Sequence, residues 1–273
     1  MSVRSFQIGD FTVGTGRLCV IAGPCLAESK DLCLEVCETM KSVCSELGFD
    51  YVFKASFDKA NRTSAGSARG MGIVSGLSIL SEVKAKFDVP VTTDIHLPEQ
   101  AAPVAEVAEI LQIPAFLCRQ SDLLEAAALT GRAVNVKKGQ FLAPWDCKNI
   151  VEKLRAFDAS GIVLTERGTT FGYNALVVDM PGLETMRSFG VPVCFDATHS
   201  AQRPGATGTS TGGARETIPA MTRAAVAVGI DALFIEVHPD PANALSDSAT
   251  QWPLSKIREL LEPVAAIRSA SMP

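Results

Sequence analysis

The chain has 273 residues, of which 47% are hydrophobic and 20% charged, and a formal net charge of -5 at pH 7. This length can bury a large core, and the even composition predicts one domain over residues 1–273. The acidic balance argues against nonspecific nucleic-acid binding, and the absence of a long apolar run or signal-peptide pattern predicts a cytoplasmic protein without membrane association.

The first predicted elements are a hairpin and a series of short strands. Residues 6–13 alternate around the Gly9-Asp10 pair, which predicts a β-hairpin within residues 1–16. Apolar runs typical of buried strands follow at residues 18–22, 51–55, 89–93, 113–118, 133–136, 162–165, 191–195 and 232–237.

Amphipathic segments separate these runs. They predict helices at residues 30–47, 72–87, 98–111, 146–159, 215–228 and 254–268. Eight strands with crossovers in about 250 residues predict a (β/α)8 TIM barrel, with the hairpin capping its N-terminal end. A doubly wound open sheet is the alternative, but no Gly-x-Gly-x-x-Gly turn follows the first strand.

The eight cysteines form no Cys-x-x-Cys pair. Most lie in apolar strand or helix patterns, which predicts reduced core thiols. Cys25 differs because it follows Ala22-Gly23-Pro24, where the first strand must end.

Polar residues follow every predicted strand. In a (β/α)8 barrel the active site forms at the C-terminal ends of the strands, so these residues should share one mouth. In chain order they are Cys25; Lys54, Lys59, Asn61 and Arg62; Asp94 and His96; Arg119; Lys137 and Lys138; Arg167; Asp196 and His199; and Glu236, His238 and Asp247.

The loop over residues 53–64 carries three cations, an amide and three hydroxyls. Lys54 and Lys59 offer point charges, and Arg62 offers a bidentate guanidinium, so the loop can hold two separate anionic groups. The alternative is a solvated basic loop. We interpret the loop as part of a site for two phosphorylated substrates.

Four residues of the predicted mouth could hold a metal ion. Strands seven, eight and one are neighbours in a closed barrel, so a thiolate, an imidazole and two carboxylates can converge there. This mixed set suits a divalent ion such as Zn, Fe(II), Mn or Co, without distinguishing among them. Taken singly, each residue could instead be a buried thiol, a hydrogen-bonded histidine or a salt-bridged carboxylate. The candidate ligands are Cys25, His199, Glu236 and Asp247.

A loop rich in glycine and hydroxyls spans residues 203–213. It lacks the Gly-Lys-Ser/Thr ending of a nucleotide-binding P-loop. It could act as a lid that excludes water, or it could be a disordered surface loop.

Over nearly its whole length the chain resembles the 3-deoxy-D-manno-octulosonate 8-phosphate synthases. The resemblance rests on residues 21–25, 53–64, 112–124, 134–141, 164–173, 195–200 and 245–247. It implies a cytoplasmic (β/α)8 barrel, usually a homotetramer. It also implies an enzyme that condenses phosphoenolpyruvate with D-arabinose 5-phosphate, releases inorganic phosphate and supplies lipopolysaccharide synthesis.

The resemblance also implies roles for individual residues. Arabinose 5-phosphate is expected beside Asn61, with its phosphate on Arg62 and Thr63, and with Arg119 and Phe116 reaching in from a neighbouring subunit. Asp94 and His96 could move protons or hold water, or they could make structural hydrogen bonds. Lys137 is chosen over Lys138 for the site. Phosphoenolpyruvate is expected among Lys54, Lys59, Gln112, Lys137 and Arg167.

Members of this family with cysteine in the Gly-Pro-Cys position are metal-dependent, and those with asparagine there are not, so Cys25 implies the metal-dependent class. Asp247 is expected to take part in catalysis as well as in metal binding. The main rival is the related 3-deoxy-D-arabino-heptulosonate 7-phosphate synthase, which uses erythrose 4-phosphate and carries Lys-Pro-Arg-Thr where this chain has Lys59-Ala60-Asn61-Arg62. A second rival is a catalytically silent sugar-phosphate-binding barrel.

Overall fold

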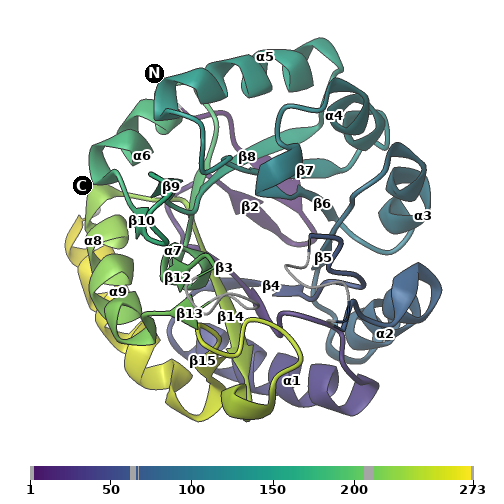
Figure 1. The fold of residues 1–273 in the computed structure, drawn as a ribbon, viewed down its shortest axis with the longest axis vertical. Helices are drawn as coiled ribbons and strands as arrows, with labels where there is room; N and C mark the ends of the chain where they lie inside the picture. The colour runs from purple at the N-terminus through teal and green to yellow at the C-terminus, as the bar shows by residue number, and fades with distance from the viewer. Residues whose placement is uncertain (1–2, 62–65, 67, 206–211, 272–273) are drawn as a thin grey trace.

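The computed structural model of the protein describes residues 3–61, 66, 68–205 and 212–271. Eight parallel strands form a barrel inside a ring of helices (Figure 1), and the pairing of β11 with β14 closes the sheet. The predicted (β/α)8 barrel is therefore confirmed. Its strands are β3 (Cys19–Gly23), β4 (Asp50–Lys54), β5 (Val91–Asp94), β6 (Ile110–Ile113), β7 (Ala133–Lys137), β8 (Gly161–Glu166), β11 (Val193–Asp196) and β14 (Ala232–His238).

The surrounding helices bury one apolar face against the barrel. In the first helix the buried residues Cys33, Val36, Cys37 and Met40 recur at helical spacing, and the Ser29 hydroxyl caps its start by accepting a hydrogen bond from the Leu32 amide at 3.2 Å. The helices are α1 (Lys30–Glu46), α2 (Gly72–Phe87), α3 (Ala101–Ala105), α4 (Ser121–Ala128), α5 (Lys148–Ala156), α6 (Met180–Arg187), α7 (Ala197–Ser200), α8 (Ile218–Val228) and α9 (Ile257–Ser271). Short 3-10 turns lie at Pro98–Gln100, Ala115–Leu117, Pro144–Cys147, Arg215–Thr217, Pro241–Asn243 and Leu254–Lys256.

The bounds predicted for the helix over residues 98–111 and for the strand over 113–118 are both wrong. The helix ends at Ala105, and the strand runs from Ile110 to Ile113, where it pairs with β5 and β7. Pro114 has no N–H to donate to a sheet, so the strand stops before it and a 3-10 turn follows. As a result Gln112 lies inside the barrel wall, and Arg119 lies well beyond the strand end.

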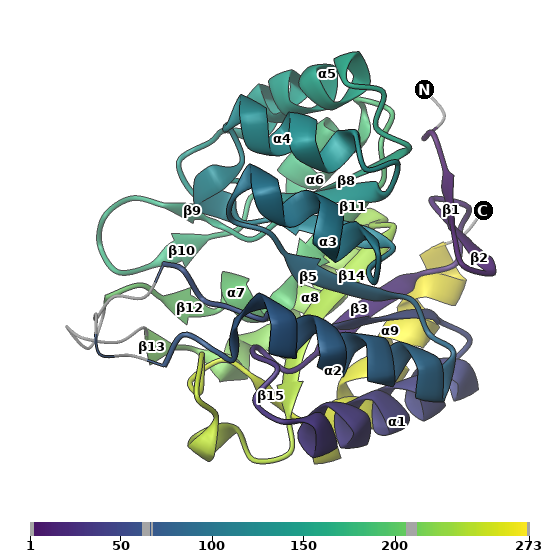
Figure 2. The same ribbon diagram turned by 90° about the vertical axis from the view of Figure 1, so that its right-hand side faces the viewer.

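The predicted N-terminal hairpin is present as β1 (Phe6–Ile8) and β2 (Phe11–Val13), joined through Gly9 at a φ of 55°. Figure 2 shows it at one end of the barrel. Phe6 packs so closely on Gly161 that a Cβ there would lie 2.4 Å from its ring. Apolar side chains from the beginnings of the barrel strands join the hairpin in one buried cluster that includes Cys19, Val52, Ile110 and Val163. The hairpin thus packs on the end where the strands begin.

The opposite end carries short antiparallel pairs and the loops that follow the strands (Figure 2). These pairs are β9 (Thr169–Thr170) with β10 (Leu176–Val177), and β12 (Gln202–Arg203) with β13 (Gly212–Gly213); β15 (Trp252–Pro253) extends the sheet beside β14. Here the barrel interior becomes polar.

All eight cysteines are buried free thiols. Within the described residues, the helices are all too short or too polar to cross a membrane.

Candidate active site

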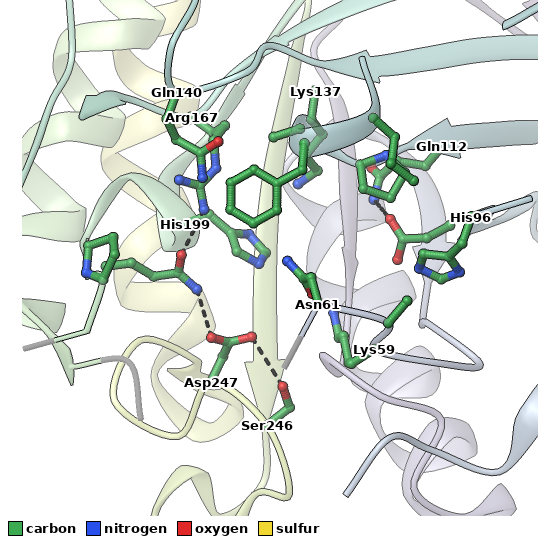
Figure 3. Close-up of a pocket in the computed structure, with 18 of the residues that line it drawn as sticks. Lys59, Asn61, His96, Gln112, Lys137, Gln140, Arg167, His199, Ser246 and Asp247 are labelled. Atoms are coloured by element: carbon green, nitrogen blue, oxygen red, sulfur yellow. Dashed lines mark hydrogen bonds between the residues drawn. The ribbon is translucent and has the colours of Figure 1, made fainter. Parts of the chain in front are cut away.

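A cavity of about 510 Å³ lies at the C-terminal ends of the strands, which is a usual size for a small-molecule site. Polar side chains from most of the barrel's strands and following loops point into it (Figure 3). Lys54, Asp94 and Lys137 each end a strand, and their side chains line the cavity. Around them stand Lys59, Asn61, His96, Gln112, Phe116, Gln140, Arg167, His199, Gln202 and Asp247.

Each lysine of the cavity lies beside a buried carboxylate. Lys54 Nζ donates to Glu236 Oε1 at 2.8 Å, and Lys59 Nζ lies 3.6 Å from the same oxygen. Lys137 Nζ forms a short contact with Asp196. The lysines line the cavity and the buried carboxylates hold them, so an incoming anion would meet cations that are already held in place.

The charges are strongly coupled. Burial alone would raise the pKa of Glu236, but Lys54, His199 and Lys59 hold that pKa well below its usual range. Burial would likewise raise the pKa of Asp94, and Lys54 and Lys59 lower it instead. Although burial opposes its charge, Lys59 has a raised pKa because Cys25, Glu236 and Asp94 surround it. Both carboxylates and the Lys59 ammonium are thus ionised at neutral pH.

A chain of hydrogen bonds crosses the barrel interior from Ser56, two residues after β4, to Thr165 in β8. Ser56 Oγ and Gln112 Nε2 both donate to Asp94. Asn135 Nδ2 donates to Gln112 Oε1 at 3.0 Å, and Thr165 Oγ1 donates to Asn135 Oδ1 at 2.6 Å. Since all five are buried, the chain fixes the Gln112 amide and the Asp94 carboxylate in one orientation at the cavity wall.

His96 lies at the rim, with its ring edge-on to Phe57 at a centroid distance of 5.8 Å. Its backbone N–H donates to Gln100 Oε1 at 2.7 Å, while its Nδ1 is buried without a hydrogen-bond partner in the described part of the chain. Burial lowers the pKa of His96 despite the nearby Asp94 and Asp58. A neutral imidazole at the cavity could accept or donate one proton.

Three of the four predicted metal ligands converge. Ligand atoms of Cys25, Glu236 and Asp247 all lie within 4.8 Å of one another, and Cys25 Sγ is 3.1 Å from Asp247 Oδ2. His199 is adjacent, with Nε2 3.6 Å from Glu236 Oε2. That oxygen is buried and has no hydrogen-bond partner within the described residues. A thiol and two carboxylates that converge, with an imidazole next to one of the carboxylates, match the donor types of a divalent transition-metal site.

The backbone holds this cluster in shape. The Cys25 N–H donates to Gln251 Oε1 at 3.1 Å, and Gln251 Nε2 donates to the Ser246 carbonyl at 2.8 Å, which ties the loop after β3 to the loop after β14. Asp247 adopts a left-handed conformation with a φ of 48°, which costs energy for a residue other than glycine. Asp247 is therefore presented by a constrained turn.

Two residues that the sequence analysis left without a role support the site. Asp196 accepts hydrogen bonds from His199 Nδ1 at 2.7 Å and from Lys137, so it orients one candidate ligand and one cation. Gln202 accepts from Arg167 Nη2 at 2.7 Å and donates to Asp247 Oδ1 at 2.6 Å. Asp196 lies three residues before His199 in the sequence, and Gln202 lies three residues after it. This closeness to a candidate ligand is the sequence feature that could have indicated their roles.

Other predicted site residues have different surroundings. Phe116 lines the cavity of its own chain and is 55% exposed. Arg119 is exposed and lies outside the described lining of the cavity. Lys138 is fully buried behind the cavity, whereas Lys137 lines it. Arg62 and Thr63 lie outside the described residues, as do residues 206–211 of the predicted lid.

Comparison with known proteins assigns the chain to a family. Residues 4–270 match the model of the DAHP synthetase I family. The chain belongs to this family. It is 56% identical to a protein from Cyanothece sp. over 96% of each chain, and 54% identical to one from Trichlorobacter lovleyi over 97% of each. It is also 54% identical to a protein from Fusobacterium nucleatum over 95% of this chain and 94% of the relative. All three relatives are named 2-dehydro-3-deoxyphosphooctonate aldolase.

Proposed function

We propose that this protein condenses phosphoenolpyruvate with D-arabinose 5-phosphate and water. The products are 3-deoxy-D-manno-octulosonate 8-phosphate and inorganic phosphate, in the synthesis of lipopolysaccharide precursors. The observation that carries the proposal is sequence identity of 52–56%, over at least 93% of the chain, to proteins that share one name, that of the octulosonate 8-phosphate enzyme. The cavity, with its cations and fixed amide, is consistent with this reaction.

In the reaction, C3 of phosphoenolpyruvate bonds to the aldehyde carbon of the sugar phosphate, water adds at C2, and phosphate leaves from C2. Lys54, Lys59 and Arg167 would hold the carboxylate and phosphate of phosphoenolpyruvate. Gln112 and Lys137 would complete that pocket, with Asn61 and the loop after it at the sugar phosphate. These groups would stabilise the anionic oxygens in place, without reorganisation during the reaction.

Polar groups at the cavity would handle the water and protons of the reaction. Asp94, ionised and fixed by two hydrogen bonds, could hold the attacking water, and His96 could exchange a proton at the rim. Asp247 also lines the cavity, and it would both take part in catalysis and bind the metal ion.

We infer that Cys25, His199, Glu236 and Asp247 hold a divalent metal ion. The orphaned buried oxygen of Glu236 and the mixed donor set support this fit. When bound, such an ion would polarise the aldehyde or activate water. Burial and Glu236 raise the pKa of the Cys25 thiol, so ion binding would release its proton. Zn, Fe(II), Mn and Co all suit this donor set.

The acceptor sugar is tested by a side-by-side assay of phosphate release. Arabinose 5-phosphate and erythrose 4-phosphate are each offered with phosphoenolpyruvate to the purified enzyme, and the products are identified by mass. We expect faster condensation with arabinose 5-phosphate because Asn61 replaces the arginine of the heptulosonate loop. Faster reaction with erythrose 4-phosphate, the outcome that the name of the DAHP synthetase I family would favour, would overturn the assignment. No condensation with either sugar phosphate would indicate a silent binding barrel.

The metal is tested by elemental analysis of the purified protein and by activity before and after chelation. We expect about one divalent ion per chain and loss of activity that the metal restores. Cys25→Asn should bind less metal while remaining folded. Full activity in excess chelator together with no bound metal would contradict the four-ligand site.

The family resemblance further supports a cytoplasmic homotetramer in which Arg119 and Phe116 extend toward a neighbouring subunit. The exposure of both side chains is consistent with this arrangement. Light scattering of the purified protein should give the mass of four chains. A monomer with full activity would refute a shared site.

A further inference from the structure

Lys138 is a fully buried cation located behind the cavity, next to Lys137 in sequence. Its Nζ donates to the carbonyls of Gly139 at 3.4 Å and Leu142 at 3.2 Å, and to Thr169 Oγ1 at 3.1 Å. Gly139 and Leu142 belong to the turn after β7, and Thr169 begins β9, directly after the turn that follows β8. One ammonium group therefore fastens the two turns together.

Glu166 is the buried carboxylate that accompanies this cation. Its Oε1 lies 3.5 Å from Lys138 Nζ and accepts hydrogen bonds from the backbone N–H of Arg167 at 2.9 Å and of Gly168 at 2.6 Å. Gly168 has a φ of 92°, a backbone conformation that favours glycine. The carboxylate thus holds the main chain of the turn at the residue whose guanidinium enters the cavity.

Both turns deliver side chains to the cavity. Arg167 and Gln140 line it together (Figure 3), and the Thr170 N–H donates to the Gln140 carbonyl at 3.0 Å, a second link between the turns. Arg167 Nη1 and Gln140 Oε1 are buried and lack hydrogen-bond partners in the described part of the chain. These polar atoms would be costly unless a ligand or water completes them.

We propose that Lys138 and Glu166 form a positioning pair that fixes the Arg167 guanidinium, and with it Gln140, for binding of phosphoenolpyruvate. This inference rests on the proposed function and names two residues that act through others. Lys138 itself does not reach the substrate: its ammonium is surrounded by protein oxygens and lies outside the described lining of the cavity. A buried ion pair is seldom a net source of stability, so the role proposed for this pair is the geometry that it imposes on the two turns.

The experiment compares the metal-replete enzyme with Lys138→Met, with Glu166→Gln, and with the two changes combined. KM is measured for each substrate at saturating concentration of the other, and phosphoenolpyruvate binding is measured by calorimetry. Lys138→Met leaves Glu166 unpaired and lets the turn shift, so we expect KM and Kd for phosphoenolpyruvate to rise about tenfold or more, with KM for arabinose 5-phosphate changed less than about twofold.

The other variants distinguish positioning from simple loss of stability. Glu166→Gln keeps an oxygen for the two backbone N–H groups, so the combined variant should recover part of the affinity for phosphoenolpyruvate. The control is an ion pair between the buried Asp231 and Arg187, whose side chain is 43% exposed; the two are joined at 3.0 Å beside the start of β14 at the opposite end of the barrel. Arg187→Met with Asp231→Asn should lower the melting temperature while leaving both KM values within about twofold.

A rise confined to phosphoenolpyruvate, partly reversed in the combined variant, supports the pair. Equal changes for both substrates, a loss of kcat alone, or no change in phosphoenolpyruvate affinity would overturn it. If Lys138→Met does not fold, the combined variant decides, because it buries no unpaired charge. A wild-type enzyme that forms no eight-carbon product would instead refute the proposed function, and the calorimetric comparison would still test the pair.

Discussion

Replacing Asp196 with asparagine tests whether one buried carboxylate orients both Lys137, a cation of the cavity, and His199, a candidate metal ligand. Asp196 is fully buried and accepts from Lys137 Nζ, from His199 Nδ1 at 2.7 Å and from the His199 N–H at 2.9 Å. Asparagine has nearly the same shape, and its amide oxygen can still cap the short helix α7. The change therefore removes the charge and replaces Oδ2, which accepts from Lys137 and His199 Nδ1, with an NH2 donor.

The expected losses follow from the contacts. Leaving Lys137 buried without its partner should cost about 3–5 kcal/mol of folding stability. The His199 ring should lose its fixed tautomer, which should weaken metal binding about 10- to 100-fold. Activity should fall at least as far, because Lys137 and His199 are both displaced.

Stability is measured by urea unfolding, metal affinity by competition with a chelator, and activity by phosphate release. The matched control is Asp231→Asn, since Asp231 is also fully buried and loses a pair with Arg187, but at the other end of the barrel. The control should be destabilised less, because Arg187 is 43% exposed and stays solvated without its partner, and its metal affinity should be unchanged. If Asp196→Asn lost stability yet kept metal affinity and activity, the assigned role of Asp196 would be refuted.

Two further predictions concern packing and pH. Gly23→Ala should lower the free energy of unfolding in urea by about 3 kcal/mol or more, because the added Cβ would lie 1.9 Å from the Lys54 carbonyl oxygen. Gly66→Ala, which has open space around it, should leave that free energy unchanged. Equal effects of the two changes would contradict this reasoning. Burial raises the pKa of the Cys33 and Cys194 thiols to about 12. Unfolded thiols lose protons near pH 8.5, so stability is complete below that pH and falls above it by about 1.4 kcal/mol per unit for each thiol. Urea unfolding at pH 8 and 9.5 should show a smaller loss for Cys33→Ala than for wild type, and an identical loss would contradict this origin.

Much of the fold was predictable because it depends on local patterns. Short apolar runs alternating with amphipathic helices are the signature of parallel βα units, and α2 was predicted at its observed bounds. The error at β6 arose where the signal is ambiguous, since residues 110–117 are apolar almost throughout. Only pairing with β5 and β7 decides which four of these residues enter the sheet.

The types of residue in the site were predictable, and their partners were not. Closure of the barrel brings Cys25 within 3.1 Å of Asp247, as the strand order suggested. Lys137 and Lys138 are adjacent, and strand alternation sends their side chains to opposite sides, but no sequence signal says which side faces the cavity. The tertiary structure decides it by placing Asp196 beside Lys137 and Glu166 beside Lys138.

The sequence by itself determined the barrel, the hairpin and the set of charged groups at the strand ends, because periodicity and residue chemistry are local properties. The tertiary structure decided which carboxylate neutralises which lysine, how Gln202 links Arg167 to Asp247, and which lysine is buried behind the site. These depend on register and closure between segments far apart in the chain, which only the folded barrel specifies.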